Sequence, residues 1–384
     1  MNDRCDVAMV IHDYYPRVGG AQQQVADLAQ LLRQDGVDVC VLTRRFAGLS
    51  AFEVRDGIPV YRLPIPGPPA LAATVFTMSG VRLLSRLRPG VIHAHEFFSA
   101  TTTAITAKRL LGNRVVATAH RSGVLGDVYR VRHKAFGERR LRAIVRHVDA
   151  FVVISREIDQ ELAELGVPAS ARVHIPNGVD TARFRPLAED EKQSLRARLG
   201  LPAGPLVVFT GRLAAEKRLD LLIGIWPQVR AAQPEAALVL VGAGPEEAAL
   251  RAAAGPGVVF AGRQDDVAPY LQAADLFVLP SAAEGLSVAL LEAMAAGLAP
   301  VVTAVGGAAD VIEHGHSGWL IPPNDPNALS AGLVRWLSDP VGRTAMAHHA
   351  RQRVLTDFAL PVMAARLRDL YGRLTGTPEW QTGN

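Results

Sequence analysis

Short apolar runs alternate with stretches of helical periodicity along the whole chain of 384 residues. In the first half the apolar runs are typical of buried strands: VAMVIH, VDVCVLT, IPVYRL, VIHAHE, RVVATAH, AFVVIS and RVHIPN. Amphipathic segments such as AQQQVADLAQLLRQDG lie between several of them. Because strands covered on both faces are continuously apolar, this alternation predicts an α/β domain with a parallel sheet between layers of helices.

The pattern changes at residues 181–204, which are polar and contain two prolines. We interpret this segment as a linker with a short helix at its centre. A second series of apolar runs then follows: PLVVFTG, AALVLVG, GVVFAG, DLFVLP, APVVTA and GWLIP. The chain is therefore expected to hold two doubly wound, Rossmann-like parallel-sheet domains, residues 1–180 and 205–357, facing across a cleft. Ligands bind beyond the carboxyl ends of the strands in such sheets, so polar residues at those ends are the candidate site.

The composition is that of an ordinary globular protein with a large core, since 49% of the residues are hydrophobic and 20% are charged. No apolar run reaches the roughly 18 residues that a membrane-spanning helix needs. The N-terminus carries acids early, unlike the basic start of a secretory signal, so we expect a cytoplasmic protein. Cys5 and Cys40 each lie in an apolar run, and we interpret them as buried hydrophobic residues, not as a disulfide or metal ligands.

The net charge of +4 conceals an excess of bases in the first half of the chain. Residues 121–146 carry eight of them: Arg121, Arg130, Arg132, Lys134, Arg139, Arg140, Arg142 and Arg146. Apolar residues are interleaved, so this stretch favours an anionic membrane surface or a lipid-linked or phosphorylated acceptor. A helix with a solvated charged face is the alternative. Few aromatic residues lie among these bases and the stretch has no recognised nucleic-acid-binding motif, which argues against nucleic acid as a partner.

Two candidate positions lie in the first half. Gly19 and Gly20 stand between the first strand and the first helix, where glycine allows close approach of a ligand to the backbone. The helix start adds unpaired N–H groups, which suit a phosphate or a polar acceptor, although a tight turn is the alternative. His120 ends the run RVVATAH and could donate a hydrogen bond to a sugar hydroxyl, or else be a satisfied core histidine.

Two cations follow the first strand of the second series. Arg212 and Lys217 flank the expected start of a helix, where the helix dipole disfavours positive charge. An anion such as a diphosphate would compensate, because Arg offers a planar fork and Lys a point charge. The alternative is a solvated surface pair with Glu216. No Asp-x-Asp motif for a metal-bound diphosphate is present, so no metal ion is expected.

The sequence SAAEGLSVALLEAMAAG carries two acids eight positions apart. Glu284 follows a strand, whereas Glu292 lies in a helix that is otherwise almost wholly apolar. A buried carboxylate needs a partner, and vicinal ribose hydroxyls would serve; a structural ion pair is the alternative. The loop also contains Gly285, Leu286 and Ser287, and the amides of Leu286 and Ser287 could bind phosphate at the helix start.

Together these motifs resemble glycosyltransferase family 4, whose members are retaining enzymes of the GT-B fold. The likeness covers nearly the whole chain and rests on YYPRVGGAQ, ATAH, IPNGVDTARFRP, GRLAAEK, EGLSVALLEAMAAG and VGGAADVIEHGHSGWLIPP. The resemblance implies that Arg212 and Lys217 hold the donor diphosphate. It also implies that Glu284 faces the donor sugar, that Glu292 faces the nucleotide ribose and that His120 helps stabilise the transition state.

The resemblance implies three further placements. Gly19 and Gly20 would contribute to the acceptor side of the site, and the backbone near Arg263 would contact the base. Residues 358–384 would form a helix that packs back on the first domain. An acid often follows the glycine pair in the family, whereas this chain has Ala21-Gln22-Gln23, which leaves acceptor recognition open.

The implied reaction moves a sugar from a nucleoside-diphosphate sugar to an acceptor hydroxyl with retention and without a metal or other cofactor. Such reactions build cell-surface glycans, glycolipids and polysaccharides, and the basic stretch would place the enzyme peripherally on the inner face of the membrane. A catalytically silent sugar-nucleotide-binding subunit and a nucleotide-sugar epimerase of the same fold are the alternatives. Neither the donor sugar, its base, the acceptor nor the oligomeric state can be inferred from the residues.

Overall fold

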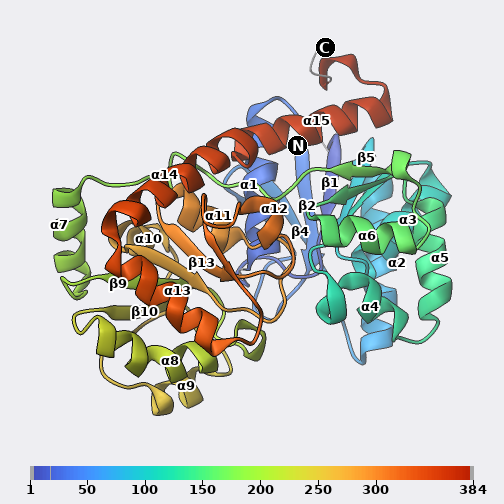
Figure 1. Ribbon diagram of the computed structural model, residues 1–384. Coiled ribbons are helices and arrows are strands. Elements are labelled where there is room, and N and C mark those ends of the chain that lie inside the picture. The colour runs from blue at the N-terminus through green and yellow to red at the C-terminus, as the bar shows by residue number, and fades with distance from the viewer. Residues whose placement is uncertain (1–3, 18, 381–384) are drawn as a thin grey trace. The chain divides into compact units, whose positions relative to one another are not determined.

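The computed structural model describes residues 4–17 and 19–380, which form two compact units with a sheet in each. The first unit takes the chain up to Asn177 together with the residues from Leu360 onward, and the second is Gly178–Ala359. Figure 1 shows both units and labels many of their helices and strands. Every apolar run that predicts a strand forms one in the structure. The expected pair of parallel α/β sheets is therefore confirmed.

The sheet of the first unit has eight strands in the order β3-β4-β2-β1-β5-β6-β7-β8. These are β1 Val7–Val10, β2 Val39–Arg44, β3 Phe52–Arg55, β4 Ile58–Leu63, β5 Val91–His95, β6 Arg114–Thr118, β7 Ala150–Val153 and β8 Arg172–His174. All neighbouring strands run parallel except β3, which is antiparallel to β4. The strand order reverses direction at β1, which is the switch point that favours ligand binding in such sheets.

The antiparallel edge strand β3 departs from the purely parallel sheet that the pattern predicts. Its side chains are mostly exposed, so it lacks the apolar run that marks the other strands. Asp56 and Gly57 both have positive φ, 50° and 81°, as a two-residue hairpin turn requires. The Asp-Gly pair is the sequence signal that identifies this hairpin.

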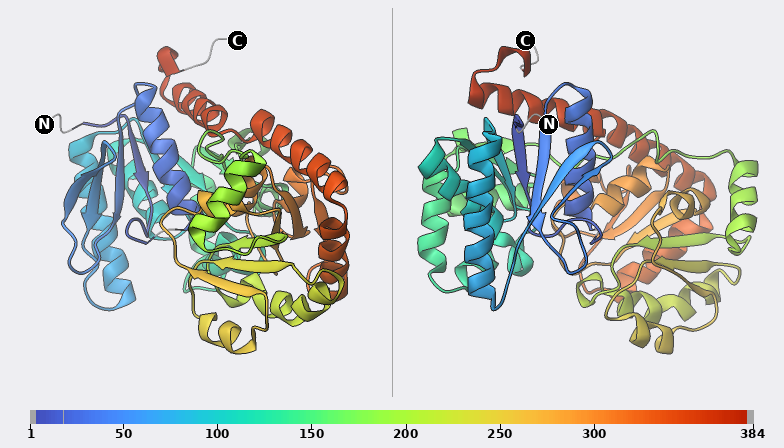
Figure 2. Two further views of the ribbon diagram at one scale, coloured as in Figure 1. Left: turned by 90° about the vertical axis from the view of Figure 1, so that its left-hand side faces the viewer. Right: turned by 180° about the vertical axis from the view of Figure 1, so that it is seen from behind.

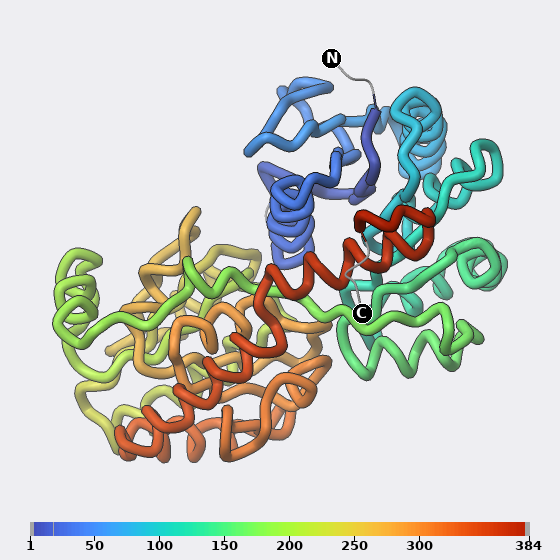
Figure 3. Tube along the Cα trace, turned by 90° about the horizontal axis from the view of Figure 1, so that it is seen from above, coloured from blue at the N-terminus to red at the C-terminus, as the bar shows by residue number. Residues whose placement is uncertain are grey.

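Helices cover both faces of this first sheet. They are α1 Gly20–Gln34, α2 Pro69–Leu87, α3 Ser99–Leu111, α4 Asp127–Arg132, α5 Gly137–His147, α6 Arg156–Glu164 and α15 Leu360–Thr375. Helix α1 packs with α15, whereas α3 packs with α2 and α5 on the other face (Figure 2). Helix α15 also contacts β5 and runs past α1 (Figure 3). Arg368 of α15 pairs with Asp35, just after α1, at 3.1 Å. The last helix is thus part of the core of the first unit.

The sheet of the second unit has six parallel strands in the order β11-β10-β9-β12-β13-β14. These are β9 Leu206–Thr210, β10 Ala237–Val241, β11 Val258–Gly262, β12 Leu276–Leu279, β13 Ala299–Thr303 and β14 Trp319–Ile321. The helices are α7 Glu189–Leu199, α8 Leu219–Ala232, α9 Glu247–Ala253, α10 Ala268–Ala273, α11 Val288–Ala295, α12 Ala308–Val311, α13 Pro326–Ser338 and α14 Pro340–Asp357. Strands β9, β10, β12 and β13 are buried along their whole length, as central parallel strands must be.

Helix α7 belongs to the second unit and is attached to it by a buried ionic cluster. Asp275, just before β12, accepts hydrogen bonds from Arg196 at 2.7 Å and from the backbone N–H of Leu206 at 2.7 Å. Lys192 pairs with the same carboxylate. Burial opposes ionisation, but Lys192 and Arg196 hold the pKa of Asp275 below its usual value. The charged residues of α7 therefore fix this helix to the sheet.

Two expectations about the apolar part of the chain concern its cysteines and its helices. Cys5 and Cys40 lie buried as free thiols with their sulfur atoms facing each other. None of the helices in the described residues is both long enough and apolar enough to cross a lipid bilayer.

Candidate active site

The polar residues of the second unit gather at the carboxyl ends of three neighbouring strands. Strands β9, β12 and β13 lie side by side, and each is followed by a loop that carries predicted site residues or supports them. The loop after β9 leads to Lys217, the loop after β12 contains Glu284, and the loop after β13 contains Gly306. The expectation that polar residues follow carboxyl ends of strands is confirmed for these loops.

Glycines bring the first of these loops against its neighbour. Gly242, at φ 145°, lies so close to Gly211 that a Cβ atom on it would overlap the Gly211 carbonyl oxygen. A Cβ on Gly244 would meet the carbonyl of Leu213 in the same way. The glycines after β10 therefore fix the backbone on which Arg212 stands, and their role in the structure is packing between loops.

A second glycine contact holds the loop after β12. The backbone N–H of Gly307 donates to the carbonyl of Gly285 at 2.6 Å. Gly306 has φ 56°, and a Cβ on it would overlap the carbonyl oxygens of Glu284 and Gly285. The turn after β13 thus cradles the backbone of Glu284, which gives that carboxylate a defined position.

Glu284 receives two donors in this position. Its Oε1 accepts a hydrogen bond from Ser281 Oγ at 2.7 Å and lies 2.5 Å from Lys217 Nζ. Both charged side chains are largely shielded, with 18% of the Lys217 side chain and 15% of the Glu284 side chain exposed. Ser281 is itself fixed, because its carbonyl accepts from Thr303 Oγ1 at 2.6 Å. The two predicted residues from different strands therefore meet in one ion pair.

Arg212 differs from Lys217 in its surroundings. Its side chain is exposed just after β9, and within residues 4–17 and 19–380 it makes no ion pair. Lys217 pairs with Glu284 and not with Glu216, the partner that the surface alternative requires. A guanidinium without an ion pair in the described residues, on the same loop as a partly buried ammonium, suits a multiply charged anion.

Helix α11 carries the second acid of the motif. Ser287 caps its start, with Oγ accepting from the N–H of Leu290. Glu292 is half-buried one turn further on, while Leu290, Leu291 and Ala293 are buried around it. The helix is buried on most faces, as its composition predicts. Its first amides have no acceptor within the helix and so present partial positive charge near Glu284.

The remaining predicted residues are more exposed. Arg263 is an exposed residue just after β11, the edge strand next to β10. Gly19 caps the start of α1 in extended conformation with φ −157°, and Gly20 is the first residue of that helix. Neither glycine has the left-handed conformation that other residues avoid. Val18 of the same motif lies outside the described residues.

His120 follows β6 in the first unit and is half-buried. Its Nε2 lies 3.1 Å from Nδ1 of His95, and the two rings stack with centroids 5.3 Å apart. His95 belongs to β5, the strand next to β6. Burial, together with the positive charge of Arg121, lowers the pKa of His120 to about 4. His120 is therefore a neutral imidazole at physiological pH.

Two acids lie near His120. Asp127, which is 3% exposed, accepts the backbone N–H of His120 at Oδ2 with a distance of 3.3 Å. Burial and the negative charge of Glu96 raise the pKa of Asp127 to about 7. Burial likewise raises the pKa of Glu96, which follows β5 at φ 70°. The carboxyl end of β5 and β6 thus combines neutral histidines with acids that hold their protons unusually well.

His95, Glu96 and Asp127 gather around the candidate residue His120, and the sequence pattern does not single them out. His93 and His95 lack the spacing of metal ligands, but they alternate on one strand and so face the same side of the sheet. Their position just before the carboxyl end of β5 is the signal that points to them. Nothing in the spacing of Asp127 indicates that its carboxylate returns to the backbone of His120.

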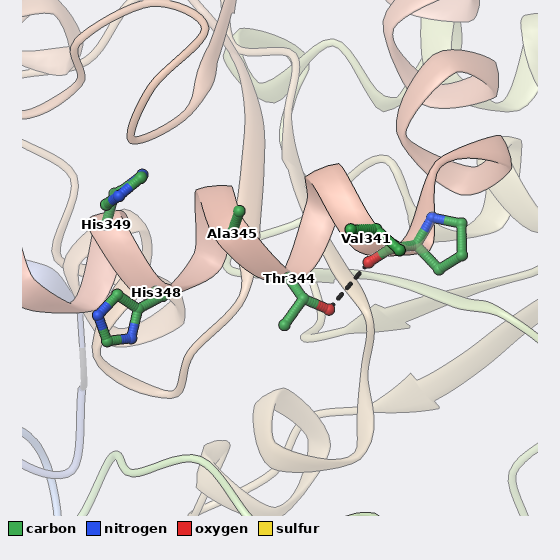
Figure 4. Close-up of a pocket in the computed structure, with 6 residues that line it drawn as sticks. Val341, Thr344, Ala345, His348 and His349 are labelled. Carbon is green, nitrogen blue, oxygen red and sulfur yellow. Dashed lines mark hydrogen bonds between the residues drawn. The ribbon is translucent and has the colours of Figure 1, made fainter.

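A separate surface pocket lies on α14 (Figure 4). Its lining is Pro340, Val341, Thr344, Ala345, His348 and His349. The close-up shows His348 and His349 on different sides of the helix, and the ring of His349 stacks on His316 at 3.8 Å. None of the predicted site residues lines it. With no arginine, lysine or carboxylate in its lining, the pocket offers little to a nucleotide.

Two protein-family models match this chain, one in each half of the sequence. The model described as Glycosyltransferase Family 4 matches residues 18–183, and the model described as Glycosyl transferases group 1 matches residues 204–339. Together the two matches span both sheets. They define a GT-B glycosyltransferase that uses a nucleotide sugar. The chain belongs to glycosyltransferase family 4, a family of retaining enzymes.

Full-length relatives carry different specificities. A GDP-mannose-dependent monoacylated alpha-(1-6)-phosphatidylinositol monomannoside mannosyltransferase of Corynebacterium glutamicum is 29% identical, over 94% of this chain and 96% of the relative. A glycogen synthase of Mycobacterium tuberculosis is 30% identical, over 95% of this chain and 94% of the relative. The chain is thus about equally similar to a phosphatidylinositol mannoside mannosyltransferase and to a glycogen synthase.

The fold matches a solved structure over nearly its whole length. Sucrose-phosphate synthase from Thermosynechococcus elongatus superposes with a TM-score of 0.83 at 24% identity, covering 97% of this chain and 100% of that chain. This likeness establishes the GT-B fold.

Proposed function

We propose that the second unit binds the nucleoside-diphosphate part of a sugar donor at the carboxyl ends of β9 and β12. The observation that carries this proposal is the Lys217–Glu284 ion pair, together with the guanidinium of Arg212 on the same loop, which makes no ion pair within the described part of the chain. In the proposal, Arg212 and Lys217 hold the diphosphate, and Glu284 then accepts hydrogen bonds from hydroxyls of the donor sugar. Diphosphate oxygens would take over from Glu284 as the partners of Lys217.

The proposed chemistry uses these charges at the leaving group. The bond between the anomeric carbon and the diphosphate oxygen breaks, and negative charge develops on the diphosphate. Arg212 and Lys217 stabilise that charge, and they stabilise it most in the transition state, where it is largest. The acceptor oxygen bonds to the anomeric carbon on the same face, and its proton passes to the departing diphosphate. His120 donates a hydrogen bond to a hydroxyl of the donor sugar and so holds the sugar in place while the bond to the diphosphate breaks.

Further residues complete the proposed donor site. Glu292 accepts hydrogen bonds from the ribose hydroxyls, and the backbone at Gly285, Leu286 and Ser287 binds phosphate at the start of α11. The backbone at Arg263 contacts the base. On the acceptor side, Gly19 and Gly20 allow the acceptor to approach the start of α1. No metal ion is needed in this proposal, because two cationic side chains already neutralise the diphosphate.

We further propose that the acceptor hydroxyl belongs to a phosphate-bearing or lipid-linked molecule, such as a precursor of a cell-surface glycan or glycolipid. Support comes from the exposed bases on α4 and α5, and from the relative whose name specifies a phosphatidylinositol mannoside acceptor. An uncharged acceptor would not need such charges.

The same surface is suited to a membrane. Three large apolar side chains stand exposed among the bases: Val124 at 65%, Tyr129 at 42% and Phe136 at 75%. Bases attract anionic headgroups at about 1 kcal/mol each, and apolar side chains between them enter the interface. We propose that α4 and α5 lie on the inner face of the membrane, where a lipid-linked acceptor would be presented.

A donor panel tests the first proposal. Thermal stability and slow nucleotide release are measured with GDP-mannose, UDP-glucose, ADP-glucose and related donors, with and without EDTA. One donor is expected to raise the melting temperature and release its nucleotide in EDTA. Arg212→Ala and Glu292→Ala should abolish the shift, whereas Arg198→Ala, an exposed base on α7, should keep it. A folded protein that no donor stabilises would contradict the proposed donor site.

Flotation tests the membrane surface. The protein is mixed with vesicles of phosphatidylcholine alone or with phosphatidylglycerol, at low and high salt. Binding is expected only to the anionic vesicles at low salt. Arg139→Glu combined with Arg142→Glu should abolish flotation, whereas the matched pair Arg198→Glu and Arg366→Glu, which alters exposed bases on α7 and α15, should float as wild type does. Equal flotation of both pairs would exclude α5 as the contact.

A further inference from the structure

Three histidine rings form a row at the carboxyl ends of β5 and β6. The rings of His93 and His95 lie 4.2 Å apart, and the ring of His95 stacks on that of His120. His93 and His95 are 1% and 2% exposed, so only His120 reaches the surface of this row. The row is therefore a buried support that ends in the one histidine proposed to contact substrate.

His93 at the buried end has a partner on each nitrogen. Its Nδ1 lies 2.6 Å from the hydroxyl of Tyr371 on α15, and its Nε2 lies 2.7 Å from Thr118 Oγ1 on β6. Burial lowers the pKa of His93 to about 3. A neutral ring held at both nitrogens cannot rotate without breaking two hydrogen bonds, so it gives the ring of His95 a fixed neighbour to pack against.

His95 in the middle of the row has a partner on only one nitrogen. Nδ1 faces Nε2 of His120, whereas Nε2 is buried without a hydrogen bond in the described residues. A neutral imidazole carries one proton, so either His95 donates to His120 or the reverse. If His120 donated, the proton of His95 would sit on the buried Nε2 with no acceptor. An orphaned buried N–H is among the rarest features of folded proteins, and its cost is the full desolvation of the donor.

We propose that His95 is a positioning residue: its Nδ1–H donates to Nε2 of His120, and this bond fixes His120 as the tautomer with its proton on Nδ1. His120 Nδ1 has no partner among the described residues and is not enclosed by them. His120 therefore presents a permanent hydrogen-bond donor to the substrate. The role of that donor in catalysis rests on the proposed function, whereas the tautomer itself does not.

The charged groups around the row leave this assignment unchanged. Asp127 takes the backbone N–H of His120 and no ring nitrogen, and Arg121 opposes a positive charge on the ring. Because burial keeps His95 and His120 neutral, each ring carries one proton. The hydrogen bond between them is therefore donated either by His95 or by His120. Of these, only donation by His95 leaves no buried donor unpaired.

Nitrogen NMR of the ¹⁵N-histidine-labelled full chain reads the tautomer directly, without any activity assay. The His120 resonances are identified by their loss in His120→Asn. Long-range proton–nitrogen spectra at about pH 7 should show His120 protonated at Nδ1 and His95 protonated at Nδ1. Protonation of His120 at Nε2 in the wild type would overturn the proposal, whether or not the chain transfers sugar.

Two variants at His95 separate positioning from packing. The side-chain amide of His95→Asn can replace the Nδ1–H donor, whereas His95→Leu fills the space without one. We expect His95→Leu to give a mixture of His120 tautomers and to lower kcat about tenfold, with the donor KM changed by less than roughly twofold, because one hydrogen bond is lost. His95→Asn should keep the single tautomer and most of kcat.

The control is His348→Asn, which alters an exposed histidine on α14 and should change neither the His120 spectrum nor kcat. If His95→Leu unfolds, the wild-type and His95→Asn spectra still decide the question. A His120 tautomer that remains single in folded His95→Leu would show that another contact fixes it, and the proposal would fail. Absence of transferase activity in the wild type, with the expected spectrum, would instead count against the proposed function alone.

Discussion

Glu284 accepts two donors from side chains on separate loops, Ser281 and Lys217, while the turn at Gly306 supports its backbone. These contacts hold a largely shielded carboxylate in one position. A carboxylate and an ammonium held together in a partly shielded place are ready to be separated by a ligand that offers both an anion and hydroxyls. At the scale of the residue, the ion pair therefore fits the donor site that we propose.

The first prediction concerns turnover. Lys217→Ala and Glu284→Ala are each expected to lower kcat by about a hundredfold, since each removes charge or hydrogen bonds that strengthen in the transition state. Initial-rate kinetics with saturating donor measures this. The matched control is Glu216→Gln, a neighbouring acid without an ion pair in the described residues, which should stay within roughly twofold of wild type. Near-normal turnover in both alanine variants would remove the ion pair from the mechanism.

Asp127 gives a prediction about pH and stability. Its pKa is raised to about 7 by burial and Glu96, whereas in the unfolded chain it is near 3.8. The contribution of this carboxyl to the free energy of unfolding is fully present below the pKa of the unfolded chain. It is lost as pH rises through about 7, because the unfolded chain releases the proton at a lower pH than the folded chain does. Between about pH 5 and pH 8 the wild type should therefore lose roughly 2 kcal/mol of unfolding free energy relative to Asp127→Asn.

Urea unfolding at several pH values measures that difference. Glu157→Gln, which changes an exposed acid on α6, serves as the control and should track wild type. The histidines have the opposite effect on stability. Because the pKa values of His93 and His120 are lowered on folding, their contribution to the free energy of unfolding is lost as pH falls from 6.5 towards 4. Parallel curves for wild type and Asp127→Asn would show that this carboxyl titrates normally.

At the scale of the element, the sequence predicts every buried strand because a parallel sheet covered on both faces needs continuous apolar runs. Strand β3 is not predicted in this way, because an exposed edge strand needs no continuous apolar run. Only the Asp56-Gly57 turn indicates it in the sequence. The places of Lys217 and Glu284 in loops after β9 and β12 are predictable, because these loops begin where the apolar run stops. Asp127 is not, because its contact with His120 depends on the path of the intervening loop.

Helix α7 shows how a polar element can be fixed by charge. Arg196 is 3% exposed and donates to Asp275, to Ala273 O and to Gly204 O. Asp275→Asn leaves this buried guanidinium without its counterion, which should cost about 3–5 kcal/mol of unfolding free energy. Because the pKa of Asp275 is lowered, the loss should be largest above about pH 4 and should shrink in acid, as the wild type also loses the pair.

Thermal and urea denaturation of Asp275→Asn test this. Asp265→Asn is the matched control, because Asp265 is exposed and makes no ion pair within the described residues. It should differ from wild type by less than about 0.5 kcal/mol. A similarly small effect in Asp275→Asn would mean that α7 is held by its apolar contacts and that the ionic cluster is incidental.

At the scale of the molecule, the two units divide the proposed work. The second supplies fixed cations and acids at β9, β12 and α11, and the first supplies neutral histidines at β5 and β6 and a basic surface on α4 and α5. The sequence predicts two sheets because the alternating pattern stops and restarts at residues 181–204. It cannot predict that Tyr371 holds His93, since that contact joins positions 278 residues apart in the chain.

If the second unit binds the donor, a nucleoside diphosphate should slow amide hydrogen exchange mainly in that unit. A ligand that binds the folded state slows exchange most where it holds the backbone, so protection should be strongest at Gly211–Lys217 and Ser281–Glu292. Arg212→Ala should lose most of this protection, and Arg198→Ala should retain it. Protection strongest at Gly20–Gln34 or around His120 would place the nucleotide on the first unit and reverse the proposed roles. Protection strongest at Pro340–His349 would transfer the site to the pocket on α14.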